Sequence, residues 1–301
     1  MSTTAVLVNP ARVSNLRSLR RTVLETLAHE GWPEPAWLQT TTQATGESQA
    51  RHAISDGATV LFVCGGDGTV MAAAAALSGS ETALAVIPSG TGNVLALNLG
   101  LPTDVSSAVR LAVSGGRRRI DLGEVDGRVF TVAAGVGLDA LVLADTPHLV
   151  KHRVGWPAYV AAGLRHLGEP QFAAQLSLDG GEPFVRQVRS ILVANVGRLP
   201  GGITLLPSAV PDDGLLDVAV IAPGRLRDWA RLWRSLVGRH PKGGRIETFR
   251  ASRIEINTDS SQPREIDGDP LPPGLALVVG VRPAALMVCV PQHVAGPGRK
   301  R

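Results

Sequence analysis

The first part of the chain alternates short apolar runs with longer segments in which apolar residues recur every three or four positions. A run of about four to eight apolar, often β-branched residues predicts a buried strand, and the longer periodic segments predict helices. The predicted strands cover residues 6–8, 37–40, 59–64 and 83–87, and the predicted helices lie near residues 15–30, 46–55, 70–77 and 105–114. This alternation is typical of a parallel sheet with helices on both faces, so we predict a doubly wound α/β domain over residues 1–121.

After residue 121 the pattern changes to a series of strands separated by Gly, Pro and Asp residues. The predicted strands cover residues 129–133, 172–178, 185–194, 215–221, 253–257, 275–281 and 286–290. Many short strands divided by turn residues indicate antiparallel sheets. We therefore predict a second, β-rich domain over residues 122–283, built as a sandwich or a barrel-like sheet.

Two glycine-rich loops follow predicted strands of the α/β domain. Residues 65–69 read Gly-Gly-Asp-Gly-Thr after strand 59–64, and residues 88–93 read Pro-Ser-Gly-Thr-Gly-Asn after strand 83–87. Glycines let backbone amides approach a polyphosphate, and a helix after the loop would turn its positive amino terminus toward the phosphates. Each loop alone could be a simple tight turn. The repeat of strand, loop and helix favours a nucleotide site.

Asp67, inside the first loop, indicates that a cation accompanies the nucleotide. A carboxylate close to a triphosphate is repelled unless positive charge lies between them. Neither loop contains the lysine of a Walker A motif, so the charge of the β- and γ-phosphates must be neutralised mainly by metal. The sequence thus predicts a nucleotide together with Mg²⁺.

Six motifs in a fixed order give the chain a specific resemblance. They are residues 65–69, 89–93, 120–123 (Ile-Asp-Leu-Gly), 137–140 (Gly-Leu-Asp-Ala), 212–217 (Asp-Asp-Gly-Leu-Leu-Asp) and 266–269 (Ile-Asp-Gly-Asp). From Val6 to about Pro291 the chain resembles the diacylglycerol kinase catalytic family, which also contains sphingosine and ceramide kinases and bacterial lipid kinases. The first motif is shared with NAD kinases and, loosely, with phosphofructokinases, whereas the later aspartate motifs are not.

The resemblance implies a Mg²⁺-dependent enzyme that transfers phosphate from ATP to a hydroxyl of a lipid, such as diacylglycerol or a sphingoid base. The positions that hold ATP by resemblance are Asn9, Pro10, Thr40, Gly65, Gly66, Asp67, Gly68, Thr69 and Thr91. In the family the last strand returns to the first domain, so the tail near residues 284–301 is expected to pack there. The alternatives are a kinase of a soluble acceptor and a non-catalytic nucleotide- or lipid-sensing module.

The acceptor hydroxyl needs a base, and the resemblance places it at Asp267 or Asp269, while Asp67 serves the metal and the phosphates. The family has Glu where this chain has Asp269, one methylene shorter, so which carboxylate reaches the hydroxyl is open. Many relatives also carry Asp where this chain has Val94, which leaves the lipid open. For the tetrapeptide at residues 266–269, a β-turn is the alternative interpretation.

The resemblance also implies a structural Mg²⁺ site in the β-rich domain. Asp213 would bind the ion together with the backbone carbonyls of Val210 and Leu215. The alternative is again a β-turn, because Asp-Asp-Gly is a common turn sequence ahead of a strand.

Positive charge is concentrated in one segment of a chain whose formal net charge is only +4. Residues 225–245 contain seven basic residues and one aspartate, and their apolar residues follow helical spacing over residues 226–237. Trp and Arg on one amphipathic helix suit an anionic membrane surface, where an enzyme would meet a lipid substrate. The alternative is a helix packed on the second domain with a solvated basic face. Nucleic acid is not expected as a partner.

The chain contains no apolar window of about 18 residues and no basic leader at its amino terminus. We therefore expect a cytoplasmic protein that associates with membranes peripherally. Cys64 and Cys289 lie in apolar runs and are expected to be buried thiols without a chemical role. The sequence leaves the oligomeric state open, a homodimer included.

Overall fold

The computed structural model describes residues 3–41, 43–90, 92–137, 170–199, 204–222 and 246–292. The chain divides into two compact units, one that runs up to Ile120 and takes in the chain from Ala285 onward, and one that covers Asp121–Ala284. The chain passes from the first unit into the second within strand β5 (Gly116–Val125) and returns within strand β14 (Asp269–Val290).

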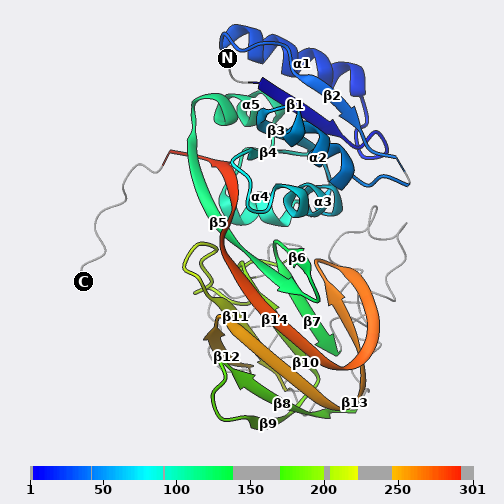
Figure 1. Cartoon of the computed structure of the whole chain (residues 1–301), viewed down its shortest axis with the longest axis vertical. Helices are drawn as coiled ribbons and strands as arrows, with labels where there is room; N and C mark the ends of the chain where they lie inside the picture. The colour runs from blue at the N-terminus through cyan, green and yellow to red at the C-terminus, as the bar shows by residue number, and fades with distance from the viewer. Residues whose placement is uncertain are drawn as a thin grey trace, which may run out of the picture. The chain divides into compact units, whose positions relative to one another are not determined.

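The first unit is built on a parallel sheet (Figure 1). Its strands are β1 (Thr3–Val8), β2 (Ala36–Gln39), β3 (Ala58–Gly65) and β4 (Ala83–Pro88), paired in the order β4-β3-β1-β2. The end of β14 adds a further parallel strand beside β4, where Val288 lies opposite Leu84. The predicted α/β fold is confirmed, because the four apolar runs of the sequence become four neighbouring parallel strands.

Helices cover both faces of this sheet. They are α1 (Leu16–His29), α2 (Glu47–Ser55), α3 (Asp67–Leu77), α4 (Val94–Leu99) and α5 (Val105–Ser114). Figure 1 shows α1 and α5 on one side of the strands and α3 and α4 on the other, and α2 packs against α3. Side chains cap the amino termini of α1 and α5. Asn15 accepts a hydrogen bond from the Ser18 amide, and Asp104 accepts one from the Ser107 amide.

The core between the sheet and helices α1 and α5 follows the periodicity of the sequence. Leu19, Val23 and Leu27 recur every four residues along α1, and all three are buried against alternate residues of the strands. Cys64 and Cys289 belong to the same core. Burial raises the pKa of the Cys64 thiol to about 12 and that of Cys289 to about 11, so both groups remain neutral thiols.

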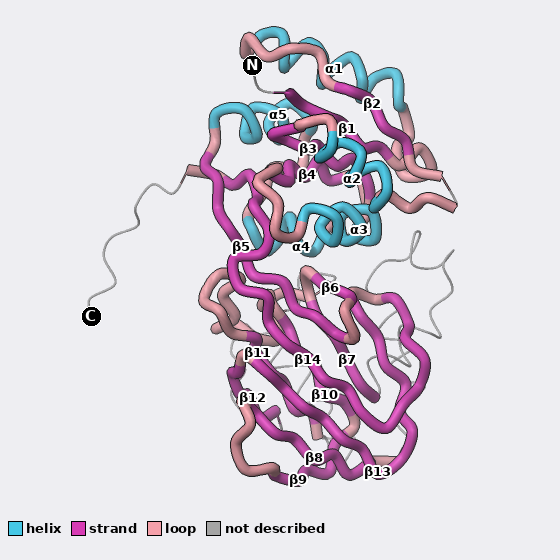
Figure 2. Tube along the Cα trace, in the orientation of Figure 1, coloured by secondary structure: helices cyan, strands magenta, loops and turns pink. Residues whose placement is uncertain are grey.

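The second unit is an antiparallel β-sandwich, in which the described residues form strands and loops (Figure 2). Strands β12 (Ile246–Ala251), β11 (Leu216–Ile221), β10 (Ser190–Ala194), β7 (Ala133–Gly137) and β13 (Arg253–Ile266) pair in that order. The first half of β13 instead pairs with β8 (Phe172–Leu178), which is followed by its partner β9 (Phe184–Val188). Strand β5 forms a hairpin with β6 (Arg128–Phe130).

The sandwich core is formed by alternate residues of the strands, as a period of two requires. Along β11, for example, Leu216, Val218 and Val220 enter the core cluster. The same cluster contains Ile191 and Val193 of β10. This arrangement confirms the predicted β-rich sandwich.

Several strand boundaries differ from the sequence prediction. The predicted strand 129–133 is divided between β6 and β7, the predicted strand 253–257 continues to Ile266 as β13, and β12 was not predicted. Residues 185–194, predicted as one strand, form β9 and β10, which pair with different neighbours. Residues 275–281 and 286–290, predicted as two strands, belong to the single strand β14, which continues past Pro283. In a sequence, a proline commonly predicts the end of a strand. Here the following residue, Ala284, has a φ of 49° and donates its N–H to the Asp121 side chain.

Candidate active site

Residues predicted to bind nucleotide lie at one edge of the parallel sheet. Strands β1, β2, β3 and β4 end at Val8, Gln39, Gly65 and Pro88, and parallel strands end at the same edge. Asn9 follows β1 and donates a side-chain hydrogen bond to Thr69 Oγ1 over 3.2 Å.

The neighbouring strand ends are also held by backbone hydrogen bonds. The Thr40 amide bonds to Val8 O over 2.9 Å, and the Asn9 amide bonds to Cys64 O over 2.9 Å. The structure therefore brings Asn9, Thr40 and the first glycine loop together. Thr91 lies outside the described residues.

Close packing of the two loops explains several of their glycines. A Cβ atom on Gly90 would lie 2.7 Å from the Cα of Gly66, and one on Gly65 would lie 2.7 Å from Thr69 Cβ. Among the described residues, apart from the neighbours of Gly68 in the chain and the backbone of its own helix, no atom lies within 4 Å of the Cβ position of Gly68. Helix α3 begins directly after Gly66, and its first turn therefore keeps open space beside Gly68.

Asp67 connects the two loops through its carboxylate. Its Oδ1 accepts a hydrogen bond from the Val94 amide at 2.6 Å, and its Oδ2 accepts one from the Asn93 amide at 3.0 Å. Burial raises the pKa of Asp67, while these two hydrogen bonds oppose the rise. Gly92 is required at this contact, because a Cβ there would lie 2.4 Å from Asp67 Oδ2. Asp67 thus fixes the second loop relative to the first.

Asn93 is a member of this loop junction whose role the sequence motif does not reveal. Its φ of 45° is left-handed, a conformation that Asn tolerates better than most residues. Its side chain accepts a hydrogen bond from the Gly90 amide and donates one to Gly90 O. The signal in the sequence is the Asn directly after Gly-Thr-Gly, since Asn is favoured where the chain turns through the left-handed region.

In the second unit, Asp267 and Gly268 form the tip of the β13–β14 hairpin. Ile266 pairs with Asp269, and both tip residues have positive φ values of 48° and 85°, as a two-residue type I′ turn requires. The β-turn alternative for this motif is therefore confirmed as its backbone conformation. Asp126 and Gly127 build a similar turn between β5 and β6, with φ values of 50° and 78°.

The Asp267 carboxylate collects far more hydrogen bonds than such a turn needs. Its Oδ2 accepts from the amide and the hydroxyl of Thr131 at 2.8 and 2.9 Å, and its Oδ1 accepts from the amides of Val132 and Ala133 at 2.9 and 3.0 Å. Asp126, at the corresponding position of the other hairpin, is exposed. Burial raises the pKa of Asp267 against the effect of these four donors. Asp269, two residues on, is also exposed.

Asp121 is a second carboxylate satisfied by backbone groups. It is 2% exposed, and its two oxygens accept hydrogen bonds from the Gly214 and Ala284 amides, both at 2.7 Å. The Asn195 side chain donates to Asp121 O at 2.7 Å. An aspartate between the apolar residues Ile120 and Leu122 is the sequence signal for such a partner. Asp121 thereby fastens the turn at residues 212–214 to β5.

We expect Asp121→Asn to lower the free energy of unfolding by about 1–3 kcal/mol, because the new amide nitrogen would face a backbone N–H that loses its acceptor. Chemical denaturation followed by circular dichroism measures the change. Asp104→Asn is the matched control, since Asp104 is an exposed helix cap that Asn replaces well. Equal stability of the native protein and Asp121→Asn would contradict the role given to Asp121.

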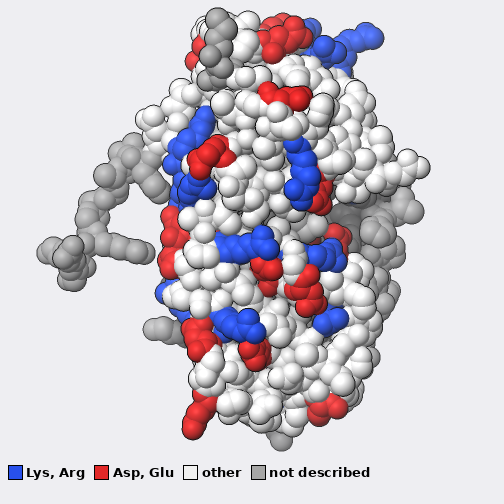
Figure 3. All heavy atoms as spheres, viewed as in Figure 1, with Lys and Arg blue, Asp and Glu red and all other residues white. Residues whose placement is uncertain are grey.

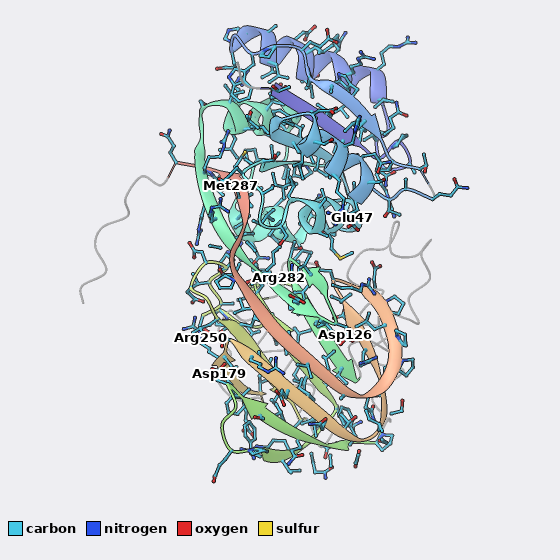
Figure 4. All side chains as sticks on the ribbon, viewed as in Figure 1. Glu47, Asp126, Asp179, Arg250, Arg282 and Met287 are labelled. Carbon is cyan, nitrogen blue, oxygen red and sulfur yellow. The ribbon has the colours of Figure 1, made fainter. Side chains whose placement is uncertain are left out.

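Asp213 lies in the turn before β11, where its carboxylate meets an arginine. Its Oδ1 accepts a hydrogen bond from the Leu215 amide at 3.1 Å, and its Oδ2 is paired with Arg250 of β12. Figure 4 labels Arg250. Within the described part of the chain, no group of three or more His, Cys, Asp or Glu side chains is arranged to hold a metal ion. The predicted metal ligand Asp213 therefore already has a cationic partner.

Charged side chains of both signs are interspersed on the face shown in Figure 3. Ion pairs among the described residues include Arg186 with Glu247 and Arg282 with Glu124. The basic segment of the sequence prediction, including residues 226–237, lies outside the described residues, as do residues 138–140 of the fourth motif. No described helix combines the length and the apolar character needed to cross a membrane.

Two family models together match nearly the whole chain. The diacylglycerol kinase catalytic domain matches residues 3–125, and the YegS C-terminal NAD kinase beta sandwich-like domain matches residues 131–290. The chain belongs to the diacylglycerol kinase and YegS-like lipid kinase family. The predicted family is thus confirmed, and the chain is a kinase of the lipid kinase family.

Individual relatives of this lipid kinase cover most of its length. A protein of Pseudomonas syringae pv. tomato named "Probable lipid kinase YegS-like" is 32% identical over 269 residues, which are 88% of this chain and 86% of that protein. A diacylglycerol kinase of Mycobacterium tuberculosis is 32% identical over 81% of this chain and 82% of its own. A crystal structure of a diacylglycerol kinase from Bacillus anthracis has a TM-score of 0.74 at 21% identity and covers 96% and 97% of the two chains, which supports the fold.

Proposed function

We propose that this lipid kinase uses ATP and Mg²⁺ to phosphorylate a hydroxyl of a membrane lipid, with diacylglycerol as the first candidate and a sphingoid base as the second. The observation that carries the proposal is the pair of glycine loops, joined by Asp67, at the carboxyl edge of the parallel sheet. Open ligand sites of α/β sheets lie at this edge.

The nucleotide part of the proposal rests on the amino terminus of α3. The amino-terminal end of a helix and its dipole favour an anion, and the space beside Gly68 leaves room for it. Asn9, Pro10, Thr40 and Thr91 would then surround the remainder of the ATP, as the resemblance implies.

Mg²⁺ would supply the positive charge that stabilises the transferring phosphoryl group. Neither glycine loop contains a lysine to take this role. Both oxygens of Asp67 already accept backbone hydrogen bonds, so we propose that Asp67 orients the loops and meets the cation with its remaining lone pairs or through water.

The hydroxyl oxygen of the lipid attacks the γ-phosphorus while the bond to ADP breaks, and a carboxylate takes the hydroxyl proton. The candidates are Asp267 and Asp269 at the tip of the β13–β14 hairpin. Four donors hold Asp267 in one orientation, whereas Asp269 is exposed. We propose that the two act together, one as the base and the other as its positioning neighbour.

Peripheral membrane association is part of the same proposal, because the substrate is insoluble in water. It is supported by the basic, Trp-containing pattern of residues 226–237. A cytoplasmic location and the absence of nucleic acid partners are predictions from the sequence, which leaves the oligomeric state open.

A lipid panel tests the proposed function. Purified protein, ATP and Mg²⁺ are incubated with mixed micelles that contain diacylglycerol, monoacylglycerol, sphingosine or ceramide, and products are identified by mass spectrometry. We expect a phosphorylated lipid for at least one of them, led by diacylglycerol. Phosphorylation of a soluble alcohol but of no lipid would favour the soluble-acceptor kinase. ATP binding without turnover on any acceptor would favour the sensing module.

A further inference from the structure

The carboxylate of Asp213 is paired with the guanidinium of Arg250. Arg250 of β12 and Asp217 of β11 are direct partners in the antiparallel pair, so the register places the guanidinium beside this carboxylate. Arg250 Nε lies 3.6 Å from Asp217 Oδ2, and Nη2 of the same guanidinium pairs with Asp213 Oδ2. One arginine therefore neutralises two carboxylates.

Both of these carboxylates are further tied to the protein. Asp217 is 2% exposed, and its Oδ1 accepts a hydrogen bond from Ser208 Oγ at 3.0 Å. Asp213 uses its other oxygen for the Leu215 amide, at 3.1 Å. The next residue after Asp213 is fastened as well, because the Gly214 amide donates to Asp121 at 2.7 Å.

This environment does not fit the Mg²⁺ that the family resemblance implies at Asp213. Mg²⁺ needs oxygen ligands at about 2.0–2.1 Å in nearly octahedral geometry. The carboxylate oxygen that would face the ion is occupied by a guanidinium, and a second cation at that place would be repelled. Asp121, Asp217 and Arg250 already stabilise the turn. A structural metal would have the same role.

We propose that Arg250 is the resident cation of the Asp213 turn and that this chain binds no structural Mg²⁺ there. The inference is independent of the proposed lipid substrate, because it concerns only the stability of the second unit. It restricts the Mg²⁺ requirement of the enzyme to the ion that comes with the nucleotide.

Thermal unfolding in the absence of nucleotide tests this proposal. The protein is stripped with EDTA, dialysed, and melted with and without millimolar Mg²⁺ at matched ionic strength. A metal that binds only the folded state raises Tm by mass action. We expect no Mg²⁺-dependent rise for the native protein. A rise in the native protein that is absent in Asp213→Asn would overturn the proposal.

Substitution of the arginine gives an independent measurement. We expect Arg250→Gln to lower Tm by about 5 °C, because two carboxylates then lose their shared counter-charge. Arg250→Lys keeps the charge and should lose less. Arg253→Gln is the matched control, since the ion pair that Arg253 forms with Glu255 within strand β13 is exposed and contributes little. An unchanged Tm of Arg250→Gln would contradict the role of Arg250.

In Arg250→Gln, the carboxylates of Asp213 and Asp217 have lost their cationic partner. The effect of Mg²⁺ on the Tm of this variant is the last measurement. If Mg²⁺ raises the Tm of this variant but not that of the native protein, the arginine and the metal compete for one place, as proposed. If Mg²⁺ raises neither, the turn has no metal site at all, which also agrees with the proposal. If Arg250→Gln does not fold, the comparison of native protein with Asp213→Asn decides alone.

Discussion

Replacement of either carboxylate at the β13–β14 hairpin by its amide is expected to lower kcat for lipid phosphorylation by at least about a hundredfold. Asparagine keeps the shape of the side chain but cannot accept the proton of the hydroxyl. The KM for ATP should change little, because the loss falls on the chemical step. Steady-state kinetics with the lipid identified in the panel measure both quantities for Asp267→Asn and Asp269→Asn.

The two variants should differ in stability. Asp267→Asn places an amide nitrogen against backbone N–H groups that now lack an acceptor, which costs about 1–3 kcal/mol. Asp269→Asn changes an exposed side chain and should leave Tm near its native value. Asp126→Asn is the matched control for a type I′ turn whose aspartate is exposed, and it should alter neither stability nor activity.

A third variant and a pH profile sharpen this test. Asp269→Glu should retain measurable activity, because it restores the residue more common in the resembling family. If Asp267 is the base, the rate should fall on acidification at a higher pH than for an ordinary aspartate, since burial raises its pKa and the protonated form cannot accept a proton. Asparagine variants that both stay within a few-fold of native kcat would refute the assignment.

Crowding of the two glycine loops should abolish phosphoryl transfer. In Gly90→Ala the new Cβ would lie 2.7 Å from the Cα of Gly66, so the loops must move apart. Misplacement of reacting groups by about 1 Å costs on the order of a hundredfold in rate. We expect at least this loss in kcat/KM for ATP, together with a lower Tm, because the strain is present without nucleotide.

The Gly66→Val variant distinguishes an effect on nucleotide binding from an effect on the stability of the fold. A Cβ on Gly66 lies 3.8 Å from its nearest neighbour, an ordinary contact, and its φ of −88° suits any residue. The fold should therefore tolerate the change, while the side chain takes space needed by phosphate. We expect activity to be abolished and Tm to stay near native. Gly280→Ala is the control, because no described atom outside its own chain neighbours lies within 4 Å of the Cβ position. An active Gly66→Val enzyme would disprove the phosphate cradle.

Several helices and strands of the described chain follow directly from local patterns in the sequence. Helix α1 is encoded by apolar residues at every third or fourth position, and β11 by alternation of buried residues. The glycine loops are equally local, because the residues before and after them identify a strand and a helix. Fold class, family and the sheet edge at which the residues predicted to bind nucleotide gather were therefore predictable from the sequence.

The partners of the aspartates were decided only by the tertiary structure. Asp267 meets Thr131, which lies 136 residues away, and Asp121 meets the amide of Ala284. Arg250 reaches Asp217 because of the β11–β12 register, and no local pattern encodes a register between distant strands. A short motif identifies a carboxylate in the sequence. Which groups that carboxylate contacts depends on the distant segments that the fold brings beside it.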